Sequence, residues 1–253
     1  MTPDLGQLSE LVRAMPGYAP RPAGRATEAM VRAAEARLGP LPPSYRWWLT
    51  EFGGVRLLGT EWATVWPEEA HDAYEALTAP WRREGRRLWF AHEPDCGDAF
   101  GFVLDQERAG GEWPVVCREG TSGEEHPLAE SFAGFLTVRT ARALGLGDGP
   151  QPALARLWRS TPGVRLDGGL LVYGPHQFVA RNREHQVARR APHWVLVGED
   201  GPGAGLFMRR HGRDRSSVLR CALDGVAPDV ETVGERVTGD LLGWLSRDVR
   251  PAR

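Results

Sequence analysis

Lysine is absent from this chain of 253 residues, whose 31 basic side chains are all arginine. The absence excludes a catalytic lysine, a Schiff base and the lysine of a Walker-type phosphate loop. Cysteine is scarce, and its three residues fit reduced thiols better than a disulfide framework. No apolar run approaches the roughly 18 residues that a membrane-spanning helix needs. We therefore expect neither a membrane protein nor a disulfide-stabilised one.

The chain also lacks an excess of positive charge, because 31 basic and 33 acidic side chains leave a net charge of −2. This balance creates no overall field that would attract nucleic acid or an anionic membrane, so we expect no direct contact with either. The first residues show no basic stretch followed by an apolar one, and a cytoplasmic location is expected. The content of 42% hydrophobic and 25% charged residues is typical of a folded globular protein.

The length is typical of two domains or of one large domain. Residues 144–153 are rich in glycine and proline and lie between two helix-like stretches near the middle of the chain. Such a segment is typical of a linker. The sequence therefore predicts a first domain over residues 1–143, a linker over 144–153 and a second domain over 154–253.

The first domain begins with helical patterns and continues with strand patterns. Asp4 and Thr27 are suitable helix N-caps, and Tyr45, Trp48 and Phe52 recur at the spacing of one helix face. Short apolar runs between turn residues indicate strands. The predicted helices lie near residues 5–12, 27–38, 43–52 and 128–136, and the predicted strands near 55–58, 63–66, 88–91, 99–104 and 113–117.

The second domain repeats this order of elements in a degraded form. The apolar positions of 128–136 match those of 237–245 at a constant offset of 109 residues. The run that begins at Trp89 also resembles the run that begins at Trp194, and each precedes a turn that contains glycine. Two copies of one module explain both matches most simply. The second copy lacks a clear counterpart of the helical pair at residues 27–54.

Histidine and cysteine residues form pairs that bear on metal and thiol chemistry. His92 and Cys96 lie four residues apart, and Cys117 and His126 lie nine apart, but these spacings match no compact zinc site. Nothing local marks either cysteine as an activated nucleophile. We predict no metal, no cofactor and no catalytic residue. A hydrolase that uses Cys96 or Cys117 with His92 or His126 stays open as an alternative.

Residues 28–54 carry a family resemblance. They contain a predicted helix that ends at Leu38-Gly39, a Leu41-Pro42-Pro43-Ser44-Tyr45 start to the next helix, and Phe52-Gly53-Gly54 at its end. This order resembles the SMI1/KNR4, or SUKH, family, although that family usually has Asn at the position of Phe52. The strand at 88–91, the Gly97-Asp98 turn and residues 129–136 are also similar, and the second domain looks like a divergent relative.

The resemblance implies an α+β fold, with a mostly antiparallel sheet and helices packed on one face, here duplicated. It also implies a role without catalysis. Bacterial members are mostly immunity proteins that bind and neutralise a cognate toxin, and many of those toxins are nucleases or deaminases. The leading hypothesis is therefore a toxin-neutralising protein that acts by stoichiometric occlusion. The alternative is a cytosolic scaffold or regulatory protein of the same fold without a toxin partner.

Two residue types indicate where a partner would bind. The chain has ten tryptophans, a residue type that is enriched in interface hot spots. Carboxylates outnumber arginines in the middle of the first domain's sequence. They would complement the positive surface of a toxin that binds nucleic acid. The partner-binding residues predicted from residue type and expected exposure are Trp47, Glu51, Glu61, Trp62, Trp66, Glu68, Glu69, Asp72, Glu93, Asp95 and Asp98. The sequence does not indicate an oligomeric state.

Overall fold

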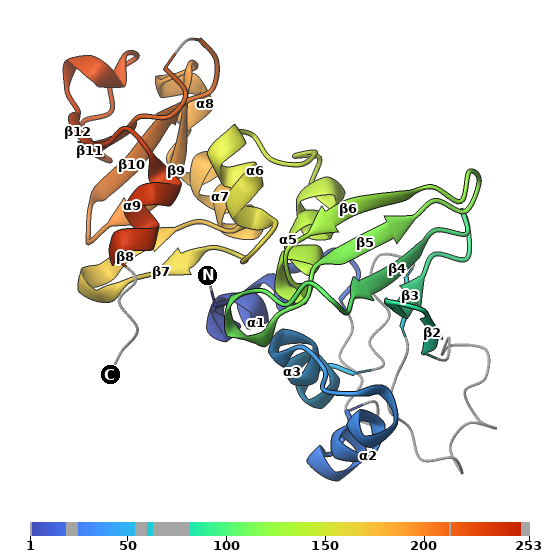
Figure 1. The fold of residues 1–253 in the computed structure, drawn as a ribbon. Coiled ribbons are helices and arrows are strands. Elements are labelled where there is room, and N and C mark those ends of the chain that lie inside the picture. The colour runs from blue at the N-terminus through green and yellow to red at the C-terminus, as the bar shows by residue number, and fades with distance from the viewer. Residues whose placement is uncertain (1, 19–24, 54–59, 63–80, 213, 249–253) are drawn as a thin grey trace.

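A computed structural model describes residues 2–18, 25–53, 60–62, 81–212 and 214–248 of the chain. These residues form two antiparallel sheets of six strands each, and every sheet has its own helices (Figure 1). We call the first sheet with its helices the N-terminal module and the second the C-terminal module. The predicted α+β class with antiparallel sheets is confirmed. Among the helices that the structure describes, none combines the length and the apolar character that a membrane crossing requires.

The N-terminal module contains four of the described helices. Its elements are α1 (Leu5–Ala14), α2 (Glu28–Leu38), α3 (Pro43–Glu51), β1 (Glu61–Trp62), β2 (Arg82–Glu84), β3 (Arg87–His92), β4 (Ala99–Val103), β5 (Val115–Arg118), β6 (Glu125–Ala129) and α5 (Phe132–Ala143). The C-terminal module contains α6 (Pro152–Trp158), β7 (Val164–Arg165), β8 (Leu170–Val172), α7 (Pro175–Glu184), α8 (Val187–Arg190), β9 (Trp194–Asp200), β10 (Ala204–Arg209), β11 (Val218–Ala222), β12 (Glu235–Thr238) and α9 (Leu241–Asp248).

Local capping starts the helices of the N-terminal module. The Asp4 carboxylate accepts a hydrogen bond from the backbone N–H of Gln7 at 3.1 Å, and the Thr27 hydroxyl accepts one from the N–H of Met30 at 3.3 Å. Both predicted N-caps are confirmed. Each cap satisfies one of the backbone N–H groups that a helix start leaves without a partner, which stabilises the helix by about 1 kcal/mol.

Helices cover one face of the first sheet, whose strand order is β1-β3-β4-β5-β6 with β2 also paired to β3. Phe90 of β3 and Phe102 of β4 contact the ring of Tyr45 from α3, at centroid distances of 5.4 and 5.2 Å. Phe132 of α5 completes this aromatic core, 4.8 Å from Tyr45. The predicted aromatic face of 43–52 is therefore the buried face of α3. The opposite face of the sheet, which we call the outer face, carries Trp89, Val103 and Val116.

The second sheet has the order β12-β11-β10-β9-β8-β7 and its own hydrophobic core. Its four strands from β9 to β12 pair in sequence and are followed by α9, as the strands from β3 to β6 are followed by α5. The first residues of α5 and α9, Phe132 and Leu241, stand at the repeat offset inferred from the sequence. The two sheets are thus consistent with a duplicated module, while the domain boundaries and the family of the second copy stay predictions.

The predicted helix over 128–136 is wrong at its start. Leu128 and Ala129 belong to β6, and the helix begins at Phe132. Ser131 has an extended backbone, and its hydroxyl accepts the N–H of Gly134 at 2.9 Å. An N-cap with this geometry sets the helix start, so the apolar residues before it continue the strand. The predicted strands over 55–58 and 63–66 lie outside the described residues.

The two modules are joined by close backbone packing. The N–H of Glu130 donates to the carbonyl of Arg159 at 2.7 Å, and the Ser131 hydroxyl donates to the carbonyl of Ser160 at 2.7 Å. Gly134 faces the same segment, and a Cβ there would lie 1.8 Å from the carbonyl oxygen of Arg159. Only a residue without a side chain permits this approach, because real non-bonded contacts are far longer.

Candidate partner-binding site

Two hairpin turns lie side by side at one end of the N-terminal module, residues 93–98 between β3 and β4 and residues 119–124 between β5 and β6. Both hairpins extend away from the C-terminal module (Figure 1). The Asp98 carboxylate accepts the backbone N–H of Gly120 at 3.0 Å, which ties the two turns together. A Cβ on Gly120 would lie 2.3 Å from the carbonyl oxygen of Cys96. Glycine at this position therefore allows the turns to touch.

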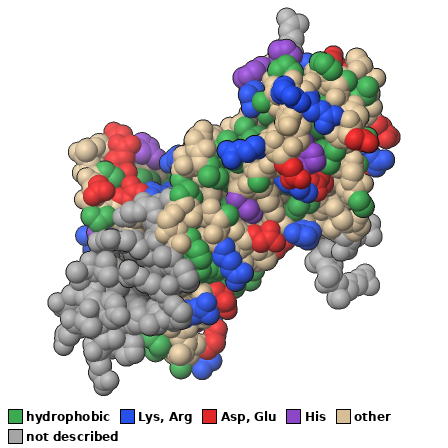
Figure 2. All heavy atoms as spheres, turned by 180° about the vertical axis from the view of Figure 1, so that it is seen from behind, with side chains coloured by type: hydrophobic (Ala, Val, Ile, Leu, Met, Phe, Trp, Pro, Cys, Tyr) green, Lys and Arg blue, Asp and Glu red, His purple; other side chains and the backbone are tan. Residues whose placement is uncertain are grey.

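Carboxylates from both turns gather at this end. We call Glu93, Asp95, Asp98, Glu119 and Glu124 the acidic hairpin end. Asp95 and Glu124 are exposed, and the other three are partly exposed. Figure 2 shows acidic side chains, with histidine beside them, over this end of the module. The concentration of negative charge can attract a positively charged partner over a distance of about one Debye length, roughly 8–10 Å in physiological salt.

Several of these carboxylates already have partners within the module. Glu93 forms an ion pair with Arg139 of α5, and both side chains are mostly buried. The imidazole Nε2 of His126 lies 3.1 Å from a carboxylate oxygen of Glu119. Glu93 and Asp98 thus support the hairpin geometry, whereas Asp95 and Glu124 project into solvent and are the side chains most accessible to a partner.

The family comparison covers this end of the molecule. Residues 25–138 match the model of the SMI1 / KNR4 family (SUKH-1), from the segment before α2 into α5. Over these residues the N-terminal module matches the SMI1/KNR4 family. A comparison with curated proteins found no match. Both turns of the acidic hairpin end lie inside the SMI1/KNR4 span, whereas α1 and the C-terminal module lie outside it.

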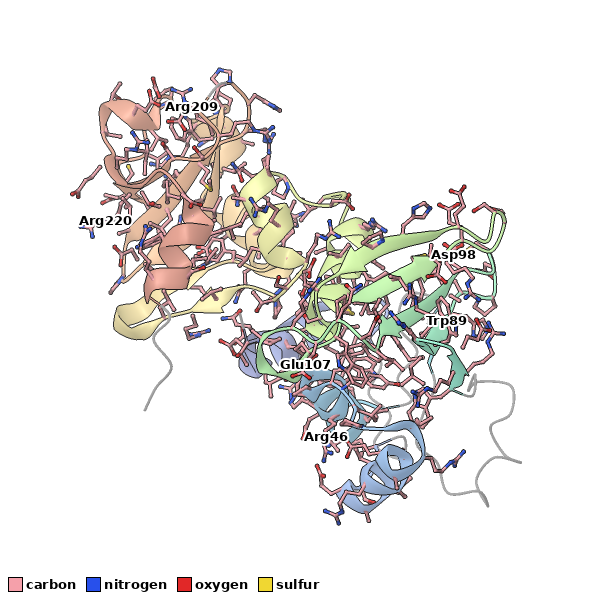
Figure 3. All side chains as sticks on the ribbon, viewed as in Figure 1. Arg46, Trp89, Asp98, Glu107, Arg209 and Arg220 are labelled. Atoms are coloured by element: carbon pink, nitrogen blue, oxygen red, sulfur yellow. The ribbon has the colours of Figure 1, made fainter. Side chains whose placement is uncertain are left out.

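The SMI1/KNR4 module brings together only some of the predicted site residues. Glu93, Asp95 and Asp98 share one turn, and Asp98 lies at the hairpin end in Figure 3. Glu61 pairs with His92 through its backbone, which places β1 beside the same turn. Trp62 is the next residue of β1. The remaining predicted positions Trp66, Glu68, Glu69 and Asp72 lie outside the described residues.

Trp47 and Glu51 belong to a different part of the SMI1/KNR4 module. Both lie on α3, whose Arg46 is far from Asp98 in Figure 3. The Trp47 ring is half-buried and packs against Phe52, with 5.2 Å between the centroids. Glu51 is exposed. The structure therefore does not bring these two residues to the acidic hairpin end.

Glu119 and Glu124 belong to the acidic hairpin end but were not predicted as partner-binding residues. The segment Gly120-Thr121-Ser122-Gly123 is a turn signal that follows a predicted strand, and it could have indicated a hairpin. The second strand of that hairpin, β6, contains Pro127 and polar residues. Such a composition is atypical of a strand, and Pro127 is tolerated because β6 is an edge strand.

Cysteines lie beside the carboxylates of this end. The Cys96 thiol is 3.3 Å from an oxygen of Glu93, and the Cys117 thiol is 4.0 Å from an oxygen of Asp98. Burial, and then the charges of Asp98 and Glu93, raise the pKa of Cys117 to about 11. A thiol with this pKa stays protonated at neutral pH, which is the opposite of an activated nucleophile.

One compact donor group occurs in the described part of the chain. Donor atoms of Glu93, Cys96 and Asp98 lie within 4.8 Å of one another, so these residues could hold a metal ion. Arg139 already binds Glu93, and the Gly120 N–H already binds Asp98. A cation would have to compete with both contacts. The absence of a metal stays a prediction.

Proposed function

We propose that this protein is an immunity protein, which binds a cognate bacterial toxin and neutralises it by stoichiometric occlusion. The SMI1/KNR4 family of the N-terminal module is consistent with such proteins. The observation that carries the proposal is the acidic hairpin end, where exposed Asp95 and Glu124 stand on two turns joined through Asp98 and Gly120. The mechanism requires no covalent chemistry.

The charge of this end determines which toxins fit it. A nuclease or a deaminase that acts on nucleic acid needs a positive surface over its substrate site. Carboxylates on a rigid hairpin pair can occupy that surface and exclude the phosphate backbone. Complementary charge also accelerates association and raises the specificity for the cognate toxin. An interface of ordinary size, about 800 Å² on each partner, suffices for stable occlusion.

Co-expression with the toxin encoded beside this gene tests the proposal. We expect the chain to restore survival and to elute with the toxin as one complex in size-exclusion chromatography. Unchanged survival together with separate elution would overturn the proposal. In that case a scaffold or regulatory role without a toxin would be the better account.

Charge-removing variants test the location of the site. We expect the double variant Asp95→Asn/Glu124→Gln to weaken toxin binding by about tenfold, mainly through slower association. The affinity of this variant should also depend less on the salt concentration than that of the wild type. A matched control is Asp105→Asn/Glu107→Gln, which removes two exposed carboxylates from the loop after β4, where Glu107 lies away from Asp98 in Figure 3. Equal weakening by both pairs would show that net charge, and not this site, governs association.

A further inference from the structure

A groove of about 440 Å³ opens beside the acidic hairpin end. Its wall contains two indoles, Trp81 and Trp89, and it continues to Gly97 in the first of the two turns. The complete lining is Trp81, Arg82, Trp89, Ala91, His92, Gly97 and Ala99. Most of this lining is apolar. Because Gly97 belongs to the turn 93–98, one end of the groove lies beside the carboxylates of that turn.

The two tryptophans are held in place by hydrogen bonds. The indole N–H of Trp81 donates to the hydroxyl of Tyr45 at 2.9 Å, and Tyr45 is itself buried in the aromatic core. The indole N–H of Trp89 donates to a carboxylate oxygen of Glu84 at 2.9 Å. Side chains that are fixed before binding lose little conformational entropy when a partner arrives.

The ring of Trp89 is also held by a cation. The guanidinium carbon of Arg118 lies 4.0 Å from the ring centroid, and the same guanidinium binds Glu84 at 2.9 Å. Glu84 in turn forms an ion pair with Arg82 at 2.8 Å. The charged side chains Arg82, Glu84 and Arg118 are thus engaged with one another, and the rest of the groove lining consists of the two indoles, His92 and small residues.

The depth of the groove comes from small residues. Ala91, Gly97 and Ala99 line it together with the two larger rings. Ala91 and Ala99 lie on the paired strands β3 and β4, and Ala99 is only half-buried. A side chain inserted from outside would therefore meet mainly indole and methyl surface, which is the surface that an apolar group prefers.

We propose that this groove receives a large apolar side chain of the toxin, carried on a segment whose neighbouring residues are arginine or lysine. The inference rests on the proposed function and names the chemistry of the contact. Its basis is charge complementarity, because the apolar groove and the carboxylates share the turn 93–98. An apolar anchor surrounded by charged contacts is the usual arrangement of an interface hot spot.

The larger hollow of the C-terminal module does not offer the same surface. It measures about 590 Å³ and is lined mainly by charged side chains. Arg181 binds Glu184 and Glu199 at 2.7 Å each, and Arg190 donates to the carbonyls of Leu223 and Asp224 at 2.8 and 2.6 Å. An apolar anchor would have to displace these contacts, which costs free energy. The groove of the N-terminal module is therefore the better binding place for an apolar side chain than the hollow of the C-terminal module.

Filling the groove tests the inference. Ala99→Trp places a bulky side chain at its rim, and Ala204→Trp is the matched control, because Ala99 and Ala204 are the half-buried first residues of β4 and β10. The probe is the purified toxin domain encoded beside this gene, in a catalytically inactive form. We expect Ala99→Trp to weaken binding by about 30-fold, the effect of losing one hot-spot anchor, and Ala204→Trp to change it less than about twofold.

A smaller variant and an unfolding measurement keep the test decisive. Ala99→Leu fills less of the groove and should weaken binding in the same direction, and urea unfolding should show that both Ala99 variants stay folded. Binding of both Ala99 variants with the wild-type affinity would overturn the groove inference and leave the proposed function intact. Failure of the wild-type chain to bind the toxin would overturn the proposed function itself.

Discussion

The stability of this protein should depend on pH through His176, a partly buried histidine whose ring nitrogens are shielded from solvent. His176 lies in the first turn of α7, and neither of its ring nitrogens has a hydrogen-bond partner among the described residues. Burial lowers the pKa of His176 from 6.5 to about 4. The folded protein therefore keeps the ring neutral at pH values where the unfolded chain already binds a proton.

The direction of the effect follows from linkage. Because the unfolded state binds the proton first as the pH falls, the free energy of unfolding falls between about pH 6.5 and pH 4 and loses nothing further below that range. At about 1.4 kcal/mol per pH unit, the complete loss is about 3 kcal/mol. The loss between pH 7 and pH 5 is about 2 kcal/mol, a large share of the stability of a typical domain.

Urea unfolding of the wild-type chain and of His176→Phe at pH 7 and pH 5 measures this effect. Phenylalanine has a similar size and takes no proton, so the variant should lose about 2 kcal/mol less than the wild type over this range. His193→Gln, at an exposed position, is the control and should follow the wild type. Parallel losses in the wild type and His176→Phe would refute the neutral imidazole and the packing of α7 that shields its nitrogens.

Three further predictions concern packing, strand support and thiol chemistry. Gly134→Ala should reduce the free energy of unfolding by about 2 kcal/mol or more in urea titrations, because its Cβ would meet the carbonyl of Arg159, whereas Gly225→Ala, with room for a Cβ, should cost far less. Asn182→Ala should cost about 2 kcal/mol, since the Asn182 amide binds both the N–H and the carbonyl of Leu196 at 3.0 and 2.7 Å; a change below about 0.5 kcal/mol would contradict that pairing. Cys117 should react slowly with a thiol reagent at pH 7.5, because its pKa is raised to about 11, and rapid labelling would favour the hydrolase alternative.

Local signals in the sequence were sufficient to predict several features of the fold. The N-caps Asp4 and Thr27 and the aromatic face of α3 depend on neighbours within a few residues, and all are as predicted. The family resemblance of residues 28–54 and the α+β class also agree with the structure and with the family match. Such features are readable because capping and periodicity act between residues that are close in the chain.

The start of α5 was predicted wrongly because local sequence patterns do not reveal strand pairing. Leu128 has the same apolar character as Phe132, and helical periodicity alone does not separate the strand residue from the helix residue. The strand forms because Ala129 pairs with Val115 and Pro127 pairs with Val116. Strand formation therefore depends on a partner segment, and a helical pattern in one segment carries no information about that partner.

The sequence by itself determined the helix caps, the buried aromatic face and the family of the first module. Tertiary structure alone decided that Asp95 and Glu124 share one end of the molecule and that small residues leave a groove beside Trp81 and Trp89. The reason is physical. Periodicity and capping are properties of contiguous residues, whereas the meeting of two turns and the shape of a groove depend on contacts between strands that are distant in the chain.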